Sequence, residues 1–539
     1  MKKKIFSLCL AVVLTAVFAL SGIITPEASQ VQAAGNTTSI VQCAISGSNV
    51  AIAASSSQVP ATDDGIFYLV QVPLYAAGIN GTVVAQAPAG AQANFTVPLN
   101  KGQANSALLS RFAIAVKQGG QLVQASEGCY VVNPEACATH TVGRTVTGKK
   151  GILVDPNKLP TGELADLGIK QAIYNIPVAN ICGPTQNASY PTINYSYNGK
   201  NYQFNGLVVA EYDLVFRTLS NKGIATTAVL LGNYTPANAD LIHPLSKDGS
   251  VCPYYFFNVA EQAGAEHLAA VGSFLGQRYS NTGHGKVDNW IIGNEVTART
   301  QWNYIASMNV NTYAAEYAKA VRLFYNTIKS ENGQANVYIS IDQQWDRNRN
   351  EPNNYDGKDL VDAFNASMAS QGNIDWGVAC HPHPVPLTNA AFWGNNAYYK
   401  NLVKHSPNSP FLTMENIEVL TDYLCRGEMI SPTGQVRSVL CSEVGYPAAQ
   451  GEQAQAAAAV FGYTAAASNQ HVDAFILSRE TDTPEEIAQG LPHGLSGLNG
   501  AHRLAYEYYK NADGPNAAAY VNNASAIMGY NILGAIQAR

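Results

Sequence analysis

Charged residues are scarce in this sequence, and no segment of it is strongly basic. Lys, Arg, Asp and Glu make up 13% of the 539 residues, and the formal net charge is −6. Proteins that bind nucleic acid need a basic surface to pair with phosphates, so we expect no nucleic-acid partner. An uncharged substrate fits this composition better. The 29 tyrosines provide rings that can pack against sugar faces and hydrogen-bond to hydroxyl groups.

After its first residues, the chain lacks any run of the ~20 apolar residues that cross a bilayer. The start has three lysines after Met1, an apolar stretch over residues 5–20 and a small-residue cleavage pattern at 31–33. Together these features predict a secretory signal peptide over residues 1–33. Cys9 lies inside the apolar stretch and not at its end, where a lipid-acceptor cysteine would stand. We therefore expect a secreted, extracellular protein with no membrane span.

The cysteines form no Cys-x-x-Cys motif and no Cys/His spacing typical of zinc sites. One of the nine cysteines falls in the signal segment and eight follow it. This even number is compatible with disulfides in an exported chain. Cys43 with Cys129 would tie the N-terminal part, and Cys182 with Cys252 would tie two long loops, but the sequence does not fix the pairing.

Residues 34–147 alternate β-rich runs with Gly, Ser, Asn and Pro, a pattern typical of an antiparallel β-sandwich. The runs expected to be strands are 39–45, 50–54, 66–74, 93–97, 110–116 and 121–125. This small all-β domain is either a carbohydrate-binding module or a unit that packs against or spaces the catalytic domain. We favour the second interpretation.

Residues 148–539 consist of short apolar strands separated by amphipathic helices, which indicates βα units around a parallel sheet. Strands are expected at 151–154, 171–176, 225–231, 289–295, 337–342, 376–381, 438–443 and 474–478. Helices are expected at 211–221, 260–279, 312–331, 357–370, 454–468 and 502–510, the last closing the barrel. This pattern predicts an α/β fold of the (β/α)8 TIM-barrel class. Insertions at 177–206, 233–257, 383–413 and 415–436 would form walls around its active-site face.

Two glutamates stand at the expected ends of the fourth and seventh strands, where barrel enzymes carry their catalytic groups. Glu295 ends the segment Asp288-Asn-Trp-Ile-Ile-Gly-Asn-Glu, and Glu443 ends Ser438-Val-Leu-Cys-Ser-Glu. These two strand ends can face each other across the barrel mouth. Two carboxyl groups can then flank one glycosidic bond at the ~5–5.5 Å that double displacement needs. One would protonate the leaving oxygen while the other attacks the anomeric carbon.

The segments Ile292-Gly-Asn-Glu-Val and Ser442-Glu-Val-Gly-Tyr-Pro resemble the paired signatures of glycoside hydrolase clan A. The resemblance covers the barrel and implies that Glu295 is the acid/base, that Glu443 is the nucleophile and that Asn294 binds the substrate 2-hydroxyl. The whole chain also resembles an uncharacterised family of secreted bacterial barrels of unknown function within that clan. The implied activity is that of a retaining glycoside hydrolase, which cleaves a β-linked polysaccharide or oligosaccharide without a cofactor.

Further side chains near the expected strand ends are candidates for substrate binding. His381 and His383 belong to the sixth strand and its end, at positions i and i+2, which point the same way. By resemblance, the clan often has a Tyr or His here that steers the nucleophile. The other candidates are Asn175, Gln343, Trp345 and Tyr446. The chain departs from the clan pattern because its second strand has no arginine to hold the nucleophile and its eighth has no tryptophan.

Two other functions compete with the glycoside hydrolase. A metal-dependent barrel hydrolase would use His381 and His383 as ligands. No other expected strand end supplies a histidine for a catalytic zinc site, so we expect no metal. A non-catalytic carbohydrate-binding or surface protein on a barrel scaffold would bind sugar without turnover. The expected partner is a carbohydrate substrate, and the protein is expected to be a monomer.

Overall fold

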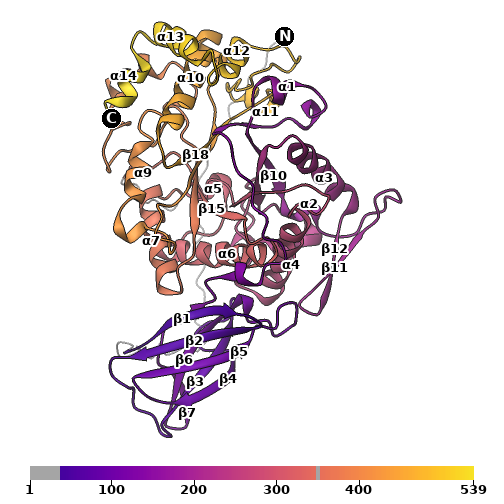
Figure 1. Cartoon of the computed structure of the whole chain (residues 1–539), viewed down its shortest axis with the longest axis vertical. Coiled ribbons are helices and arrows are strands. Elements are labelled where there is room, and N and C mark those ends of the chain that lie inside the picture. Colours follow the sequence, from indigo (N-terminus) through magenta and orange to yellow (C-terminus); the bar gives the residue numbers. More distant parts are fainter. Residues whose placement is uncertain (1–36, 348–352) are drawn as a thin grey trace, which may run out of the picture. The chain divides into compact units, whose positions relative to one another are not determined.

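The computed structural model describes residues 37–347 and 353–539, which form an antiparallel β domain followed by a closed parallel barrel (Figure 1). The predicted signal peptide, residues 1–33, lies outside the described residues and stays a prediction. Within the described ranges, no helix has the length and hydrophobicity that a membrane span requires. Both expected fold types, the all-β domain and the (β/α)8 barrel, are confirmed.

The β domain consists of two antiparallel sheets around a core of their own. One sheet has the order β1 (Thr38–Ser46), β2 (Asn49–Ser56), β5 (Gln92–Pro98), and the other has the order β4 (Thr82–Pro88), β3 (Ile66–Pro73), β6 (Ser110–Gln118), β7 (Gln121–Gln124), with β8 (Cys129–Tyr130) paired to β6. The inward side chains of β5 alternate strictly with exposed ones, as the sequence pattern indicates. Strand β4 was not expected, because it is an edge strand with no fully buried residue.

The eight cysteines that follow the predicted signal segment are free thiols. The buried thiols of Cys43 on β1 and Cys129 on β8 lie in hydrogen-bonding contact, and this contact together with burial raises the pKa of Cys43. The expected proximity of these two residues is therefore observed, without a bond between them. The Cys182 thiol contacts the backbone carbonyl of Val178 at 3.3 Å.

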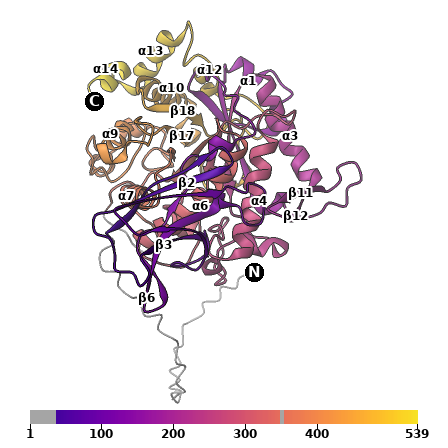
Figure 2. The same ribbon diagram turned by 60° about the horizontal axis from the view of Figure 1, so that its bottom comes forward.

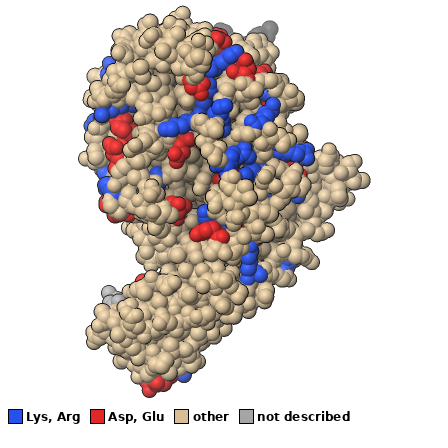
Figure 3. Space-filling model, viewed as in Figure 1, with Lys and Arg blue, Asp and Glu red and all other residues tan. Residues whose placement is uncertain are grey.

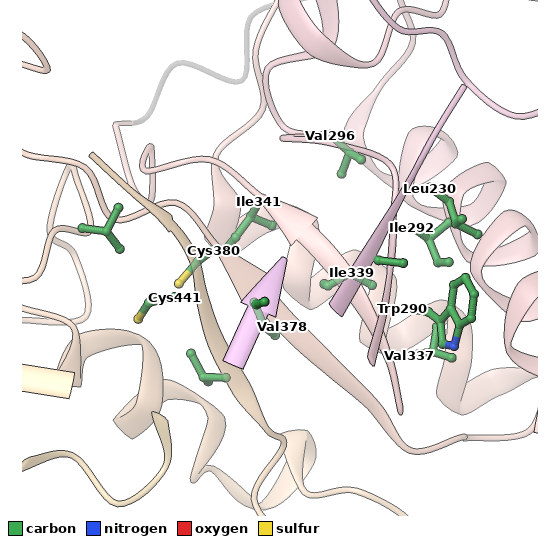
Figure 4. Close-up of a cluster of buried hydrophobic side chains, with 14 of the residues drawn as sticks. Leu230, Trp290, Ile292, Val296, Val337, Ile339, Ile341, Val378, Cys380 and Cys441 are labelled. Carbon is green, nitrogen blue, oxygen red and sulfur yellow. The ribbon is translucent and has the colours of Figure 1, made fainter. Parts of the chain in front are cut away.

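The barrel closes through parallel strands in the order β10, β13, β14, β15, β16, β17, β18, β9. Their bounds are β9 (Lys150–Leu153), β10 (Gln171–Pro177), β13 (Ala225–Leu231), β14 (Asn289–Ile292), β15 (Asn336–Ile341), β16 (Trp376–Cys380), β17 (Val439–Val444) and β18 (Val472–Leu477). Successive side chains point to opposite faces of a strand. Val229 and Leu440 therefore pack inside the barrel, whereas their neighbours Leu230 and Cys441 pack outward against the helices (Figure 4).

The α-helices are α1 (Glu163–Asp166), α2 (Val178–Ile181), α3 (Gly206–Asn221), α4 (Gln262–Arg278), α5 (Arg299–Trp302), α6 (Val310–Glu331), α7 (Gly357–Ser370), α8 (Ala397–Lys400), α9 (Glu418–Leu424), α10 (Glu452–Ser468), α11 (Pro484–Ala488), α12 (Leu504–Lys510), α13 (Ala517–Met528) and α14 (Ile532–Gln537). All six expected helices are present. Helix α12 does not end the fold, because α13 and α14 follow it and pack on α10.

An unexpected hairpin, β11 (Ile193–Tyr197) and β12 (Lys200–Phe204), lies within the insertion at 177–206. Its turn is Asn198-Gly199, and both residues have positive φ angles, of 48° and 76°. Asn-Gly between two alternating runs is the strongest local signal for a hairpin with such a turn. The signal for this hairpin was therefore present in the sequence.

The β domain and the barrel pack against each other through helix α6 and share buried residues. Asn326 on α6 donates a hydrogen bond to the carbonyl of Leu108 at 2.8 Å, and Lys101 forms an ion pair with Glu331 at 3.3 Å. Leu74 and Tyr130 of the β domain belong to the same apolar cluster as the outer face of the barrel. The two domains thus contribute to one continuous core.

This shared core predicts that the barrel is unstable without the β domain. In a fragment of residues 148–539, the groups that cover Asn326 and Glu331 are lost and the apolar surface under Leu74 and Tyr130 is exposed. Burial of Leu74 and of Tyr130 contributes about 1.5–3 kcal/mol each. This is a large part of a typical free energy of unfolding of about 5–15 kcal/mol. We expect the fragment to have a clearly lower melting temperature than residues 34–539, or to be insoluble. A melting temperature equal to that of the longer chain would contradict the shared core.

Candidate active site

Glu295 lies three residues beyond the end of β14, on a turn with two residues in the left-handed region. Gly293 has a φ of 78° and Glu295 a φ of 40°. A left-handed conformation is unusual for a residue with a side chain, and such strain is concentrated at functional sites. The backbone N–H of Glu295 donates to the hydroxyl of Ser340 on the neighbouring strand β15 at 2.9 Å. This turn directs the carboxyl group of Glu295 to the mouth, with 15% of its side chain exposed.

The turn after Glu295 is held by a buried carboxyl group. Asp342, directly after β15, accepts hydrogen bonds from the hydroxyl of Thr297 at 3.0 Å and from the amide of Gln344 at 2.8 Å. Burial and the nearby charge of Glu295 raise the pKa of Asp342 to about 7. Asp342 therefore fixes the loop that carries Glu295 and is only partly ionised near neutral pH.

Glu443 lies on β17 at an irregularity in its pairing with β18. Cys441 pairs with Phe475 and Val444 pairs with Leu477, so the register shifts between these two pairs. Such a bulge turns a side chain away from the position that strict alternation would give it. The side chain of Glu443 is 36% exposed, and its carboxyl group faces two histidines from the segment directly after β16.

His381, the residue after β16, connects the two glutamates. Its Nδ1 lies 2.8 Å from Oε1 of Glu295 and 3.8 Å from Oε2 of Glu443. Burial disfavours the charged imidazole, but the negative charges of Glu443 and Glu295 outweigh it and raise the pKa of His381 to about 9. His381 is thus an imidazolium at neutral pH and holds a proton within hydrogen-bonding distance of Glu295.

His383 faces Glu443 with Nε2, whereas its Nδ1 contacts the backbone of Gly445. Its Nδ1 accepts a hydrogen bond from the backbone N–H of Gly445 at 3.0 Å, so in the neutral ring the proton is on Nε2, 3.9 Å from Oε1 of Glu443. Burial lowers the pKa of His383 and keeps the ring neutral. Burial also opposes the charge of Glu443, but the positive charges of His381 and Arg479, together with the nearby ring of His383, lower the pKa of this carboxyl group. Glu443 is therefore ionised.

Glu295, His381 and His383 also form a group whose potential metal-ligand atoms lie within 4.8 Å of one another. The hydrogen bonds of these residues do not suit a metal. A histidine that binds a metal through Nε2 carries its proton on Nδ1 and donates it to an acceptor. Nδ1 of His383 instead faces the N–H of Gly445, which is a donor. His381 would also have to become a neutral imidazole to bind a metal, although the negative charges of both glutamates stabilise its protonated form. These residues do not fit a metal centre.

The other expected site residues whose side chains are not fully buried are Asn175, Asn294 and Gln343. Asn175 is exposed on β10 and points the same way as Ile173, which packs inside the barrel below it. Asn294 precedes Glu295 and is half-buried. Oε1 of Gln343 is buried and finds no hydrogen-bond partner among the described residues. These three polar side chains therefore stay candidates for substrate binding.

Trp345 and Tyr446 do not belong to this group, because both side chains are buried away from the mouth. Trp345 has no exposed surface; its indole N–H donates to the carbonyl of Pro407 at 3.1 Å and its ring packs edge-on against Tyr423. Tyr446 is 2% exposed and its hydroxyl group lies against Gly462 of α10. Neither side chain has a free surface for a sugar, so the expectation that they bind substrate is corrected.

Three residues that the sequence did not single out lie close to the catalytic candidates. His493, in the segment after β18, stacks on His383 with ring centres 6.2 Å apart, and burial lowers its pKa to about 3. Tyr254 packs against the residues inside the barrel, and burial and the charge of Glu443 raise its pKa. The ring of Tyr254 lies 6.4 Å from that of Trp302, which is 37% exposed. Tyr254 and His493 come from the segments after β13 and β18, and Trp302 is the last residue of the short helix α5, which follows β14.

The model of the family of unknown function DUF5722 matches residues 143–536, and its description states no activity. Comparison with curated proteins found no match. Among solved structures, the chain is similar to a β-D-glucuronidase of Dictyoglomus thermophilum, at 10% identity and a TM-score of 0.36, over 89% of this chain and 69% of that one. It is also similar to a β-glucosidase of Thermotoga maritima (14%, TM-score 0.39, 68% and 87%) and to fungal β-1,4-galactanases (11%, 0.40, 68% and 99%). Similarities at this level carry no information about activity.

Proposed function

Because the chain belongs to the family of unknown function DUF5722, its activity has to be inferred from its own site, and we propose that it is a retaining glycoside hydrolase. The observation that carries the proposal is the pair of carboxyl groups of Glu295 and Glu443, which come from two different strand ends and both approach Nδ1 of His381, at 2.8 Å and 3.8 Å. Catalytic groups of barrel enzymes come from the carboxyl ends of different strands. A pair of carboxyl groups is the minimal machinery of most glycosidases.

The distances of the two carboxyl groups from His381 are compatible with retention. One oxygen of Glu295 lies 2.8 Å from Nδ1 of His381, and one oxygen of Glu443 lies 3.8 Å from the same atom. Any bend at the nitrogen brings these two oxygens closer together, so the site allows the ~5–5.5 Å spacing of retaining enzymes.

The protonation of the site supports one assignment of roles. Glu443, with its lowered pKa and more exposed side chain, is the nucleophile: its carboxylate attacks the anomeric carbon as the bond to the leaving oxygen breaks. Glu295 is the acid/base: it protonates that oxygen and later takes a proton from the water that displaces Glu443. The carboxylate of Glu443 is released in this second step.

His381 couples the two steps through its charge. The negative charge of Glu443 contributes most to raising the pKa of His381. That charge disappears when Glu443 forms the covalent bond to the sugar, so His381 becomes more acidic at the moment when Glu295 must supply a proton. The proton on Nδ1 can then pass to Glu295 over 2.8 Å. When the intermediate is hydrolysed, Glu443 regains its charge and His381 regains its proton.

The surroundings of the site favour an uncharged, β-linked polysaccharide or oligosaccharide as substrate. Asn175, Asn294 and Gln343 offer amides to sugar hydroxyls, and the exposed ring of Trp302 beside Tyr254 can pack against a sugar face. The amide of Asn294 is the group that would bind the 2-hydroxyl. With a signal peptide, the protein would act on such polymers outside the cell.

A screen with polymers tests this function. The protein should release reducing sugars from at least one member of a panel of β-1,3- and β-1,4-linked glucans, galactans, mannans and xylans. Proton NMR in the first minutes should show the new reducing end in the β configuration, because two displacements at the anomeric carbon restore it. The α configuration as first product would contradict retention. Binding of a polymer without turnover, unchanged in Glu443→Ala, would support the non-catalytic sugar-binding protein instead.

A further inference from the structure

A cavity of about 730 Å³ lies between the β domain and the flank of the barrel. Two stretches of the β domain line it, from the end of β3 into β4 and from the end of β5 to the start of β6. On the barrel side it is lined by the β11–β12 hairpin, the first turns of α4 and Leu323 of α6. Figures 1 and 2 both show the hairpin beside α4. The catalytic candidates do not line this cavity, so it lies outside the catalytic site, on the flank of the barrel.

The lining of this cavity combines apolar and polar side chains and carries no net charge. Lys200 and Glu266 are its charged residues, and they form an ion pair with each other. Gln71 on β3 and Asn198 in the hairpin turn provide amides, and Tyr75 and Tyr202 provide half-buried rings. The face of the β domain visible in Figure 3 is likewise almost free of charged side chains, except at its tip. A charged ligand would find no unpaired opposite charge among these lining residues.

One amide in the cavity has an unused hydrogen-bonding atom. Oδ1 of Asn198 is buried and finds no partner among the described residues. An acceptor that is buried without a donor costs about 1–3 kcal/mol, so a ligand that supplies a hydroxyl group there would remove a real penalty. The left-handed backbone of Asn198, with a φ of 48°, keeps this side chain at the tip of the hairpin.

We propose that this cavity is a second carbohydrate site, which binds an uncharged oligosaccharide segment of the polymer that the barrel cleaves. Tyrosine rings match the apolar faces of sugars, and amide groups match their hydroxyls. An apolar ligand would leave Oδ1 of Asn198 unsatisfied, and an anion or cation would meet an ion pair that is already neutralised. The proposal rests on the proposed function for the identity of the polymer, but binding can be measured without turnover.

Two variants test the site. Asn198→Gly removes the acceptor and tolerates the left-handed backbone, and Tyr75→Ala removes a half-buried ring that lines the cavity and also packs against the apolar core. The matched controls are Asn281→Gly, at another left-handed asparagine with a φ of 75° that does not line the cavity, and Tyr508→Ala, at another half-buried tyrosine that packs against the same core. Circular dichroism and melting temperature establish that each variant is folded.

Binding is measured by pull-down with the insoluble polymers of the panel and by affinity electrophoresis with the soluble ones, for the intact protein and in a Glu443→Gln background. The two cavity variants should bind the polymer at least about 3-fold more weakly than the controls, the effect of one hydrogen bond of about 0.7 kcal/mol or more. KM for the polymer should rise similarly, while kcat/KM for a small aryl glycoside should not change.

The outcomes separate this proposal from the proposed function. A polymer that is bound but not cleaved, with weaker binding in both cavity variants, would overturn the hydrolase and support the second site. If both folded cavity variants bind the polymer as tightly as the controls and have the same KM, the second site is overturned. Loss of aryl glycoside activity in Asn198→Gly would also overturn it, because the cavity would then act on the catalytic centre itself. Binding of the apolar dye ANS in the cavity without any polymer binding would assign it to another class of ligand.

Discussion

The variant Glu443→Ala is expected to lose turnover of every substrate, with kcat reduced by at least about 10⁴-fold. Without this carboxylate no covalent glycosyl intermediate can form, and the charge that holds the proton on His381 disappears as well. The loss should be as large for an aryl glycoside with a good leaving group as for the polymer, because attack on the anomeric carbon is common to both. Initial rates over a range of substrate concentrations measure the effect.

Two further variants control this experiment. Glu443→Gln keeps the shape of the side chain without its charge and should be as inactive as the alanine variant. Glu415→Gln changes another half-buried glutamate, and burial raises the pKa of its carboxyl group to about 7. The charge partners of Glu415 include Arg539 and none of the catalytic candidates. It should keep normal activity. Ordinary activity in folded Glu443→Ala would show that Glu443 is not the nucleophile.

The same variant reports on the electrostatic link to His381. In the intact protein the pKa of His381 is raised to about 9, mainly because the charge of Glu443 outweighs burial. With the charge removed in Glu443→Gln, burial should dominate more strongly, and the pKa of His381 should fall. An NMR titration of the histidine side chains measures this shift. An unchanged pKa would mean that Glu443 does not act on His381.

The barrel strands can be predicted from the sequence because each strand combines an inward and an outward apolar position, as Leu440 and Cys441 do. The long helices are predictable for a similar reason, since a broad apolar stripe recurs along them. Helix α13 buries only Val521, Ala524 and Met528, a stripe too narrow to stand out from its many alanines. Edge strand β4 has no fully buried residue at all.

The catalytic candidates could be located because the carboxyl ends of all barrel strands lie on the same face, so a residue at such an end lies near the barrel mouth. Glu295, Glu443 and His381 meet at the mouth for this reason, and their roles stay predictions. The direction of a side chain beyond the strand end is set by turns and bulges that the sequence pattern does not encode. Trp345 therefore points into the core, although it follows its strand by only a few residues. Tyr254 comes from a long loop, which a periodic pattern cannot place.

The variant Glu295→Ala should separate the two steps of the reaction. Cleavage of the polymer needs a protonated leaving oxygen, so kcat should fall by about 10²–10⁴-fold, the typical contribution of general acid catalysis. An aryl glycoside with a good leaving group needs no proton, so the intermediate on Glu443 should still form and then accumulate, because Glu295 is missing as base for the water. Azide needs no base to attack, and its addition should restore turnover of the aryl glycoside.

The product of this rescue identifies the role of each glutamate. In Glu295→Ala, azide displaces Glu443 from the covalent intermediate, so the glycosyl azide should have the β configuration of the substrate. In Glu443→Ala, azide can only attack the substrate directly, in the space left by the missing carboxylate, and any azide product should have the inverted configuration. NMR of the isolated glycosyl azides distinguishes the two. An inverted azide from Glu295→Ala would exchange the roles proposed here, because Glu295 would then be the residue whose place the azide takes.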